Sequence, residues 1–252
     1  MLQILPIVGI PEVRTGTDLA ALLADNMARC GVTPAAGDVL VVTQKIVSKA
    51  LGLFVRIEDV QPGPRALELA SASRKDPRLV ELALRESTDV VRVAPNVLIT
   101  RHVSGHVMAN AGIDQSNVGG SSAGAIVLLL PREPDRCAEA LREGLAAHWP
   151  EPPAIIISDS FGRPWRLGVA NFAIGASGLP SIIDRRGEID RDGRRLEVTL
   201  VALADLIAAA AGLVTGEGAE GIPAAVVRGL AISAPPSPAA AMLRPAAEDL
   251  FR

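Results

Sequence analysis

The run of isoleucines at residues 155–157 is the feature that most restricts how this chain can fold. A short unbroken apolar run that follows two prolines predicts a buried strand. Asp159 and Ser160 come directly after it, so we expect the strand to deliver a carboxylate and a hydroxyl into a polar turn. With Arg163 and Arg166 close behind, this combination suits a hard divalent cation bound beside phosphate oxygens. The alternative is that Asp159 caps the turn and the arginines pair with surface acids.

Strands and helices alternate along the rest of the chain without a repeat period. We expect helices over residues 18–31, 76–87, 135–147 and 204–212. We expect further strands over residues 39–42, 97–103, 106–110, 126–130, 196–200 and 224–227. A Ser104-Gly105 turn joins two of these strands as a hairpin, whereas helices connect others. The pattern therefore favours an α+β fold with mixed sheets and packed helices over a doubly wound parallel sheet.

The length of 252 residues, 49% of them hydrophobic, allows one large domain or two small ones. We expect residues 1–252 to form a single module, with two interwoven subdomains as the alternative. Prolines at positions 235, 236 and 238 predict a stiff linker within residues 234–252 that leads to a short terminal helix.

Composition excludes several classes of function. The chain has 25 basic and 28 acidic residues, a net charge of -3, no basic stripe and no tyrosine, which argues against a nucleic-acid partner. The two cysteines and three histidines lack metal-ligand spacing, which argues against zinc and cysteine catalysis. The apolar run at residues 200–214 is too short to span a membrane, and the N-terminus lacks the basic start of a signal peptide. We expect a soluble, cytoplasmic protein that binds small ligands.

Two segments near the N-terminus could contact a nucleotide. In residues 5–11, two prolines and a glycine could fix an apolar ledge for a flat base, although an edge strand with a turn is the simpler interpretation. Residues 43–49 follow a hydrophobic strand and carry Lys45 and Lys49. A lysine at a strand end can place a point charge on phosphate, but it can equally be an ordinary solvated residue.

Two later segments combine acids with glycines. Residues 110–120 join Asp114 to amides and hydroxyls, and such oxygen ligands suit magnesium or manganese; the alternative is an Asx turn. In residues 216–223, three glycines would let backbone amides approach phosphates, while Glu217 or Glu220 would repel them unless a metal lies between. Neither a Walker-type nor a Rossmann glycine pattern occurs in the sequence.

Together these segments resemble the coenzyme F420:L-glutamate ligases, also called coenzyme F420-0 gamma-glutamyl ligases. The resemblance runs in order along nearly the whole chain and rests on five motifs: Leu5-Pro-Ile-Val-Gly-Ile-Pro11, residues 37–49, residues 110–117, Asp159-Ser-Phe-Gly-Arg163 and residues 216–223. It implies an α+β fold particular to the family, an interwoven homodimer, and a ligase that depends on GTP and on Mg²⁺ or Mn²⁺ and is stimulated by K⁺. The substrates it implies are coenzyme F420-0 and L-glutamate.

The resemblance also implies roles for individual residues. The residues that would surround GTP are Ile10, Pro11, Glu12, Val13, Gln44, Lys49, Asn117, Thr215, Gly216, Gly218, Ala219, Glu220, Gly221 and Ile222. Metals would fall to Asp114, Asp159, Ser160 and Glu217, which agrees with the expectation that distant carboxylates converge only around cations. In the phosphoryl transfer that follows from these roles, Lys49 or Arg163 would hold the transferring group.

The sequence departs from the family pattern in places that affect no proposed ligand. Ser158 stands where threonine is frequent, and Leu51 and Leu206 each replace a usual glutamate. Two rival functions remain: another nucleotide- and metal-dependent amide ligase or kinase on the same scaffold, and a silent paralogue that binds the deazaflavin without consuming GTP.

Overall fold

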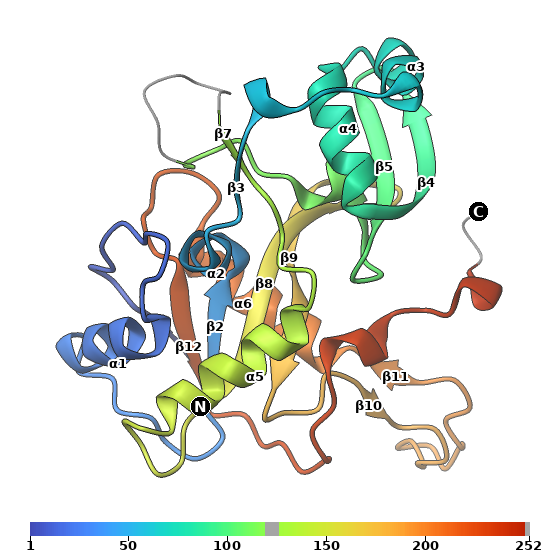
Figure 1. The fold of residues 1–252 in the computed structure, drawn as a ribbon. Coiled ribbons are helices and arrows are strands. Elements are labelled where there is room, and N and C mark those ends of the chain that lie inside the picture. Colours follow the sequence, from blue (N-terminus) through green and yellow to red (C-terminus); the bar gives the residue numbers. More distant parts are fainter. Residues whose placement is uncertain (119–125, 250–252) are drawn as a thin grey trace.

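A five-stranded mixed sheet forms the centre of the computed structural model, which describes residues 1–118 and 126–249. The strand order is β1 (Gln3–Pro6), β12 (Ala224–Arg228), β2 (Val39–Thr43), β8 (Ala154–Arg163) and β9 (Arg166–Ser177). Only β2 and β8 run parallel; the other three pairings are antiparallel. Figure 1 shows this sheet with helices on both sides of it.

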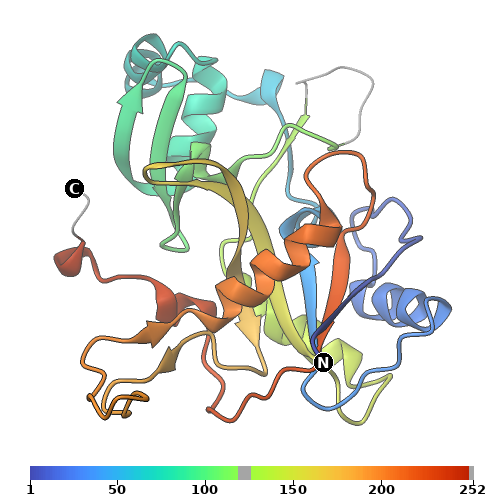
Figure 2. The ribbon, with the colours of Figure 1, turned by 180° about the vertical axis from the view of Figure 1, so that it is seen from behind.

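Helices cover both faces of the central sheet, which explains why its inner strands are apolar without interruption. Leu40 and Val42 of β2 face the core beneath α1 (Leu19–Arg29) and α5 (Pro134–Leu145). Val39 and Val41 face the opposite core beneath α6 (Leu203–Thr215), which crosses the sheet in Figure 2. The expected strand at residues 155–157 is confirmed, and each of its isoleucines is fully buried, which contributes roughly 1.5–3 kcal/mol per side chain.

A second, smaller sheet carries its own helices. Its order is β4 (Ser87–Ala94), β5 (Val97–His102) and β6 (Val107–Ala109), and α3 (Pro64–Ser73) and α4 (Pro77–Arg85) pack on it. This sheet has a separate core that contains Leu69, Val80 and Leu98. In Figures 1 and 2 it lies beyond the end of the central sheet from which the β8–β9 hairpin extends.

Short elements complete the chain. They are α2 (Gln44–Leu51), β3 (Phe54–Arg56) paired with β7 (Ile126–Leu128), β10 (Ile183–Asp184) paired with β11 (Leu200–Val201), and the 3₁₀ turns at Ile57–Asp59, Asn110–Gly112, Ala239–Met242 and Ala246–Glu248. Across the described ranges, no helix is both long and apolar enough to cross a membrane.

Several local predictions are confirmed, together with the mixed α+β character. Asp18 and Asp76 cap α1 and α4: the Asp18 side chain accepts from the Ala21 amide at 3.0 Å and the Asp76 side chain from the Arg78 amide at 2.9 Å. The expected hairpin is β5–β6, and its turn contains Gly105 at φ 93.

Three expectations were wrong. The predicted turn after residue 158 does not exist, because β8 continues through Asp159 to Arg163 and pairs with β9 along that length. The predicted end of α6 at Gly212 is also wrong: α6 runs on to Thr215, and a β-carbon at Gly212 would lie 2.5 Å from Asn171 Nδ2, so this glycine permits close packing. Of the strand expected over residues 196–200, only Leu200 belongs to a strand, β11 (Leu200–Val201); the other residues lie in a turn-rich segment with isolated backbone hydrogen bonds.

The C-terminal helix was not found in the expected form. The described part of that segment contains two short 3₁₀ turns, and residues 250–252 lie outside the described residues. Residues 119 and 120 of the expected metal-binding segment also lie outside them.

Candidate functional site

A cleft of about 710 Å³ opens where the parallel strands β2 and β8 end. Thr43 and Ser158 are neighbours in register there, and both line the cleft. The C-terminal edge of parallel strands is a common place for ligands, because loops and helix N-termini converge on it. The other lining residues lie within six stretches, namely residues 10–13, 44–49, 108–117, 159–162, 169–171 and 215–223.

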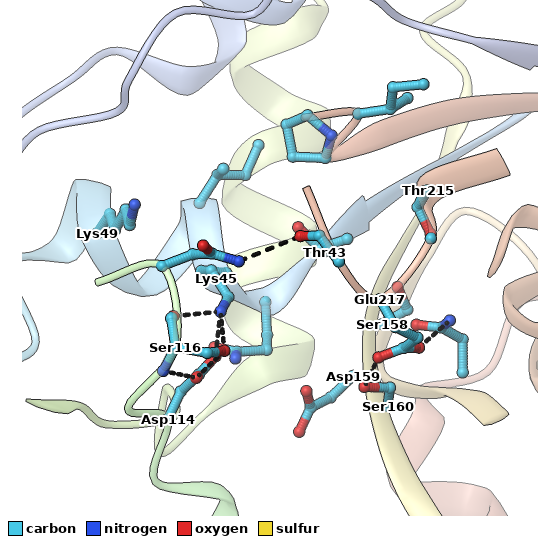
Figure 3. A pocket seen from close by; sticks show the side chains of 18 of the residues that line it. Thr43, Lys45, Lys49, Asp114, Ser116, Ser158, Asp159, Ser160, Thr215 and Glu217 are labelled. Atoms are coloured by element: carbon cyan, nitrogen blue, oxygen red, sulfur yellow. Dashed lines mark hydrogen bonds and ion pairs between the residues drawn. The ribbon is translucent and has the colours of Figure 1, made fainter. Parts of the chain in front are cut away.

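The Asp159 carboxylate is the group that the cleft perturbs most. Figure 3 shows Asp159 between two polar clusters, one around Asp114 and the other around Glu217. The pKa of Asp159 is raised to about 7, mainly by desolvation; repulsion from Asp114 and Glu217 acts in the same sense, whereas the Ser160 amide and Lys45 act in the opposite sense. A carboxylate in this position would be stabilised in its charged form by a cation.

The first polar cluster is Lys45, Asp114 and Ser116. Lys45 Nζ lies 2.5 Å from Asp114 Oδ2 and donates to the Ser116 carbonyl at 2.6 Å. The Ser116 amide and hydroxyl donate to Asp114 Oδ1 at 2.8 and 2.9 Å. Asp114 is therefore held by the lysine and by its own loop.

The second polar cluster joins β8, β9 and the segment after α6. The Ser160 hydroxyl donates to Glu217 Oε2 at 2.7 Å, and Asn171 Nδ2 lies 3.3 Å from Glu217 Oε1. Ser160 and Glu217, both expected near metal, thus lie in direct contact. Figure 3 shows this pair across the pocket from Asp114.

The expected metal ligands surround one cleft but do not form a compact ligand set. Asp114, Asp159, Ser160 and Glu217 all line it. Within residues 1–118 and 126–249, no group of three or more histidine, cysteine or acidic side chains is gathered closely enough to hold one ion. The donor chemistry is that of Mg²⁺ or Mn²⁺ sites, because it consists of carboxylate and hydroxyl oxygens.

Lys49 projects from α2 into a buried position. Its side chain is only 6% exposed and forms an ion pair with Glu12, whose side chain is 68% exposed. Lys45 and Lys49 lie four residues apart, so α2 presents both ammonium groups on one face. At the start of the same helix, Gln44 accepts a hydrogen bond from Ser48 at 3.0 Å.

The segment after α6 has the glycine-dependent geometry expected from its sequence. Gly216 and Gly221 both have φ 68, which a residue with a side chain adopts only with strain. The Gly218 amide donates to Glu220 Oε2 at 2.8 Å, and Asn117 Nδ2 donates to the Gly218 carbonyl at 3.3 Å. The first contact is internal to the segment, and the second joins the segment to the Asp114 loop.

Most of the residues expected around GTP line the cleft. They are Ile10, Pro11, Glu12, Val13, Gln44, Lys49, Asn117, Thr215, Gly216, Gly218, Ala219, Gly221 and Ile222. Glu220 does not line it and instead accepts the hydrogen bond from Gly218. Arg163 does not line it either, because its guanidinium donates to the Leu167 carbonyl at 3.0 Å within the β8–β9 hairpin.

Four polar residues of the cleft received no individual role in the sequence analysis, although three of them lie in segments that it singled out: Thr43, Lys45, Ser116 and Asn171. The spacing of Lys45 from Lys49 was a usable signal, since both had to share a helical face once residues 44–51 form a helix. Asn171 carried no such signal, because its place follows from the β8–β9 register that pairs it with Ser160.

Comparisons with known proteins point to one family. Residues 8–229 match the model of the family described as F420-0:Gamma-glutamyl ligase. The chain is 43% identical to the coenzyme F420:L-glutamate ligase of Methanopyrus kandleri, with 100% of this chain and 98% of the relative covered. The proteins of the same name from Methanothermobacter thermautotrophicus and Methanocaldococcus jannaschii are 42% and 38% identical, over 90% and 86% of this chain and 89% and 85% of their own lengths.

Proposed function

Because the chain belongs to the F420-0:Gamma-glutamyl ligase family, we propose that it joins L-glutamate to coenzyme F420-0 at the expense of GTP. The first glutamate is attached through an amide to the F420-0 carboxylate, and later ones through gamma-glutamyl linkages. The family match and the names of the relatives support gamma-glutamyl ligase activity in F420 biosynthesis. The arrangement of the cleft supports the GTP-dependent chemistry proposed below.

The observation that carries this proposal is the charge arrangement of the cleft. Three carboxylates, those of Asp114, Asp159 and Glu217, face one space that Lys45 and Lys49 also line. A space with both signs of charge suits a polyphosphate bound together with divalent cations. A purely cationic cleft would suit phosphate alone, and a purely acidic one would suit a cation alone.

The reaction needs activation because a carboxylate does not accept an amine at neutral pH. In the proposed first step, an oxygen of the F420-0 carboxylate attacks the γ-phosphorus of GTP, the bond to the β-phosphate oxygen breaks, and GDP leaves. The product is an acyl phosphate. The glutamate amine then attacks the acyl carbon, loses a proton, and displaces inorganic phosphate, which retains the attacking carboxylate oxygen.

The side chains of the cleft divide the work. Lys49, buried and directed into the cleft from α2, is placed to hold the transferring group as a point charge. We assign this role to Lys49 and not to Arg163, because the Arg163 guanidinium donates to the Leu167 carbonyl within the β8–β9 hairpin. Backbone amides of residues 216–221 would approach the phosphates. Asp114, Asp159, Ser160 and Glu217 would hold Mg²⁺ or Mn²⁺, which supplies charge neutralisation on the phosphates, and K⁺ would stimulate the reaction.

We also propose that the protein acts as a cytoplasmic homodimer. The outer face of α6 presents Leu206 and Leu213, which are 60% and 81% exposed, on one side of the helix. A second copy of the chain would cover this apolar stripe. Replacing both leucines with glutamate should then shift the sedimentation coefficient to that of a monomer, and an unchanged dimer would refute the involvement of α6.

One experiment separates the proposed ligase from its rivals. Purified protein is incubated with F420-0, L-glutamate, GTP and Mn²⁺, and the products are read by mass spectrometry. Stepwise addition of glutamyl residues with matching release of phosphate supports the proposal. GTP consumption with a different acceptor would indicate another ligase or kinase on this scaffold, and F420-0 binding without GTP consumption would indicate a silent paralogue.

A further inference from the structure

A second cavity of about 320 Å³ adjoins the cleft and has no role in the reaction described so far. Its volume is at the small end of the range for ligand sites, which suits a molecule smaller than a nucleotide. Ile113, Asp114 and Ser116 line both cavities, so one extended stretch of chain forms the wall between them. A ligand in the second cavity would be separated from the proposed phosphoryl-transfer site only by this stretch of chain.

All lysines of the chain lie at these two cavities. Lysine occurs in this sequence only at positions 45, 49 and 75, and arginine supplies the remainder of the 25 basic residues. Lys45 and Lys49 line the cleft, and Lys75 lines the second cavity. A chain that uses arginine almost everywhere else therefore places a compact ammonium charge at each of these sites.

Lys75 differs from the other two lysines because its charge is uncompensated. Lys45 pairs with Asp114, and Lys49 pairs with Glu12. Over the parts of the chain that the structure describes, the Lys75 ammonium has neither an ion pair nor a hydrogen bond, although its side chain is half-buried. A half-buried, unpaired ammonium is a ready partner for a carboxylate.

The acids of the second cavity are already occupied. Asp76 is held by the Arg78 guanidinium at 2.6 and 3.0 Å, and this contact keeps the pKa of Asp76 below its ordinary value. Asp114 is held by Lys45. The uncompensated charge is therefore positive. The side-chain amides of Asn110 and Gln115 also line the cavity, and neither has a hydrogen-bond partner among the described residues.

The wall between the cavities is fixed by a strained turn. Asn110, Ala111 and Gly112 have φ of 51, 53 and 68, so three successive residues adopt the left-handed conformation. Only glycine does so without cost, and the penalty for a residue such as Ala111 is about 1–2 kcal/mol. Such strain is retained where the surrounding structure requires one backbone path, and here that path positions Ile113 and Asp114.

We propose that this second cavity binds the incoming L-glutamate, with Lys75 holding one of its carboxylates. This inference rests on the proposed ligase function. Asn110 and Gln115 supply further hydrogen bonds, and the amine end of the amino acid is directed toward the Asp114 wall, beyond which the acyl phosphate forms. The unpaired Lys75 ammonium and the two side-chain amides match the carboxylates of this ligand, and the acidic Asp114 wall matches its amine.

The test compares steady-state constants for variants of Lys75 with F420-0 as the acceptor. Lys75→Ala should raise the KM for glutamate about tenfold or more, because it removes a charge-assisted hydrogen bond, while the KM for GTP stays within about twofold. Lys75→Arg should fall between the parent and Lys75→Ala. Gln115→Glu, which adds a repelling charge, should also raise the KM for glutamate. Arg92→Ala is the matched control, because Arg92 is exposed on β4 and lines neither cavity.

A binding measurement checks the same claim without turnover. Calorimetric titration of the parent protein with L-glutamate should give a signal that weakens in Lys75→Ala and persists in Arg92→Ala. An unchanged glutamate KM in Lys75→Ala, in a parent enzyme that does ligate glutamate, would overturn the subsite and leave the proposed function intact. A parent protein that ligates nothing would instead refute the proposed function.

A carboxylate at Lys75 could also belong to an acceptor that already carries a glutamyl tail. The acceptor used distinguishes the two sources, because F420-0 has no tail. A glutamate KM that rises with F420-0 supports the incoming amino acid. A defect seen only when the acceptor already bears one glutamate would overturn the proposal and assign Lys75 to the tail.

Discussion

Replacing Asp159 with asparagine should stabilise the metal-free protein and inactivate the enzyme at the same time. Its raised pKa means that the folded state resists ionisation of this carboxyl, whereas the unfolded chain ionises it near the ordinary value of 3.8. Stability is therefore lost as the pH rises from about 4 to about 7, and the full penalty is present above pH 7. Asparagine has a similar shape but cannot ionise, so it removes that penalty.

The size of this effect follows from the two pKa values. The interval from 3.8 to about 7 corresponds to at most about 4 kcal/mol at pH 8. Water and counter-ions in the cleft screen the repulsion, so we expect a gain of about 1–2 kcal/mol in the free energy of unfolding, or roughly 2–8 °C in Tm. Turnover should fall about 10²-fold or more, equivalent to about 3 kcal/mol of barrier, because the variant loses a charged ligand to the cation that would neutralise the phosphates.

The assay is chemical denaturation with a chelator present, at pH 8 and again at pH 4.5. The stability gain of Asp159→Asn over the parent should shrink at pH 4.5, because there the Asp159 carboxyl of the folded parent is protonated and therefore as neutral as asparagine. Asp89→Asn is the control, because Asp89 is exposed on β4, and it should change neither stability nor turnover. An Asp159→Asn protein no more stable than the parent at pH 8 would refute the electrostatic argument, and near-normal turnover would refute the role of Asp159 at the metal.

Four further changes test the nucleotide and metal contacts. Lys49→Ala should weaken the binding of GTP and of GDP alike in calorimetry. Unchanged affinity for both nucleotides would show that Lys49 only forms its ion pair with Glu12 and does not contact phosphate. Gly218→Ala should leave the Tm of the free protein nearly unchanged, because Gly218 has no left-handed φ and its added methyl would meet only the Glu220 side chain, at 3.5 Å. The same change should reduce the increase in Tm that GTP and Mn²⁺ cause. A full increase in Tm would show that the phosphates do not approach the backbone at Gly218. Gly221→Ala, at φ 68, should by contrast lower the free energy of unfolding by about 1 kcal/mol even without ligand. Glu217→Gln should raise the Mn²⁺ concentration needed for half-maximal activity, and an unaltered requirement would remove Glu217 from the metal site.

Local signals in the sequence predicted the interior of the fold well. The isoleucines at residues 155–157 had to be buried on both faces, and the caps Asp18 and Asp76 fixed two helix starts because their side chains satisfy free amides. The same local reasoning failed at Gly212, where a glycine inside α6 makes room for Asn171 of β9. A contact between elements distant in sequence leaves no local pattern, so helix termination was the wrong interpretation.

The polar half of β8 shows the same limit. Residues 158–163 contain no apolar alternation, so nothing local predicts a strand there. They remain extended because β9 supplies hydrogen-bond partners along their length. The candidate cleft could be outlined from five collinear motifs, but the positions of Lys45, Asn171 and Lys75 follow from strand register and helix placement, which a single sequence does not reveal.

The central claim is that GTP activates the acceptor carboxylate as an acyl phosphate, and oxygen transfer tests it most directly. F420-0 is prepared with heavy oxygen in its reacting carboxylate and incubated with the protein, L-glutamate, GTP and Mn²⁺. Mass spectrometry of the released phosphate should find one heavy oxygen for each amide formed, because the attacking carboxylate oxygen leaves with the phosphorus. Phosphate without heavy oxygen, or amide formation without GTP, would contradict the account.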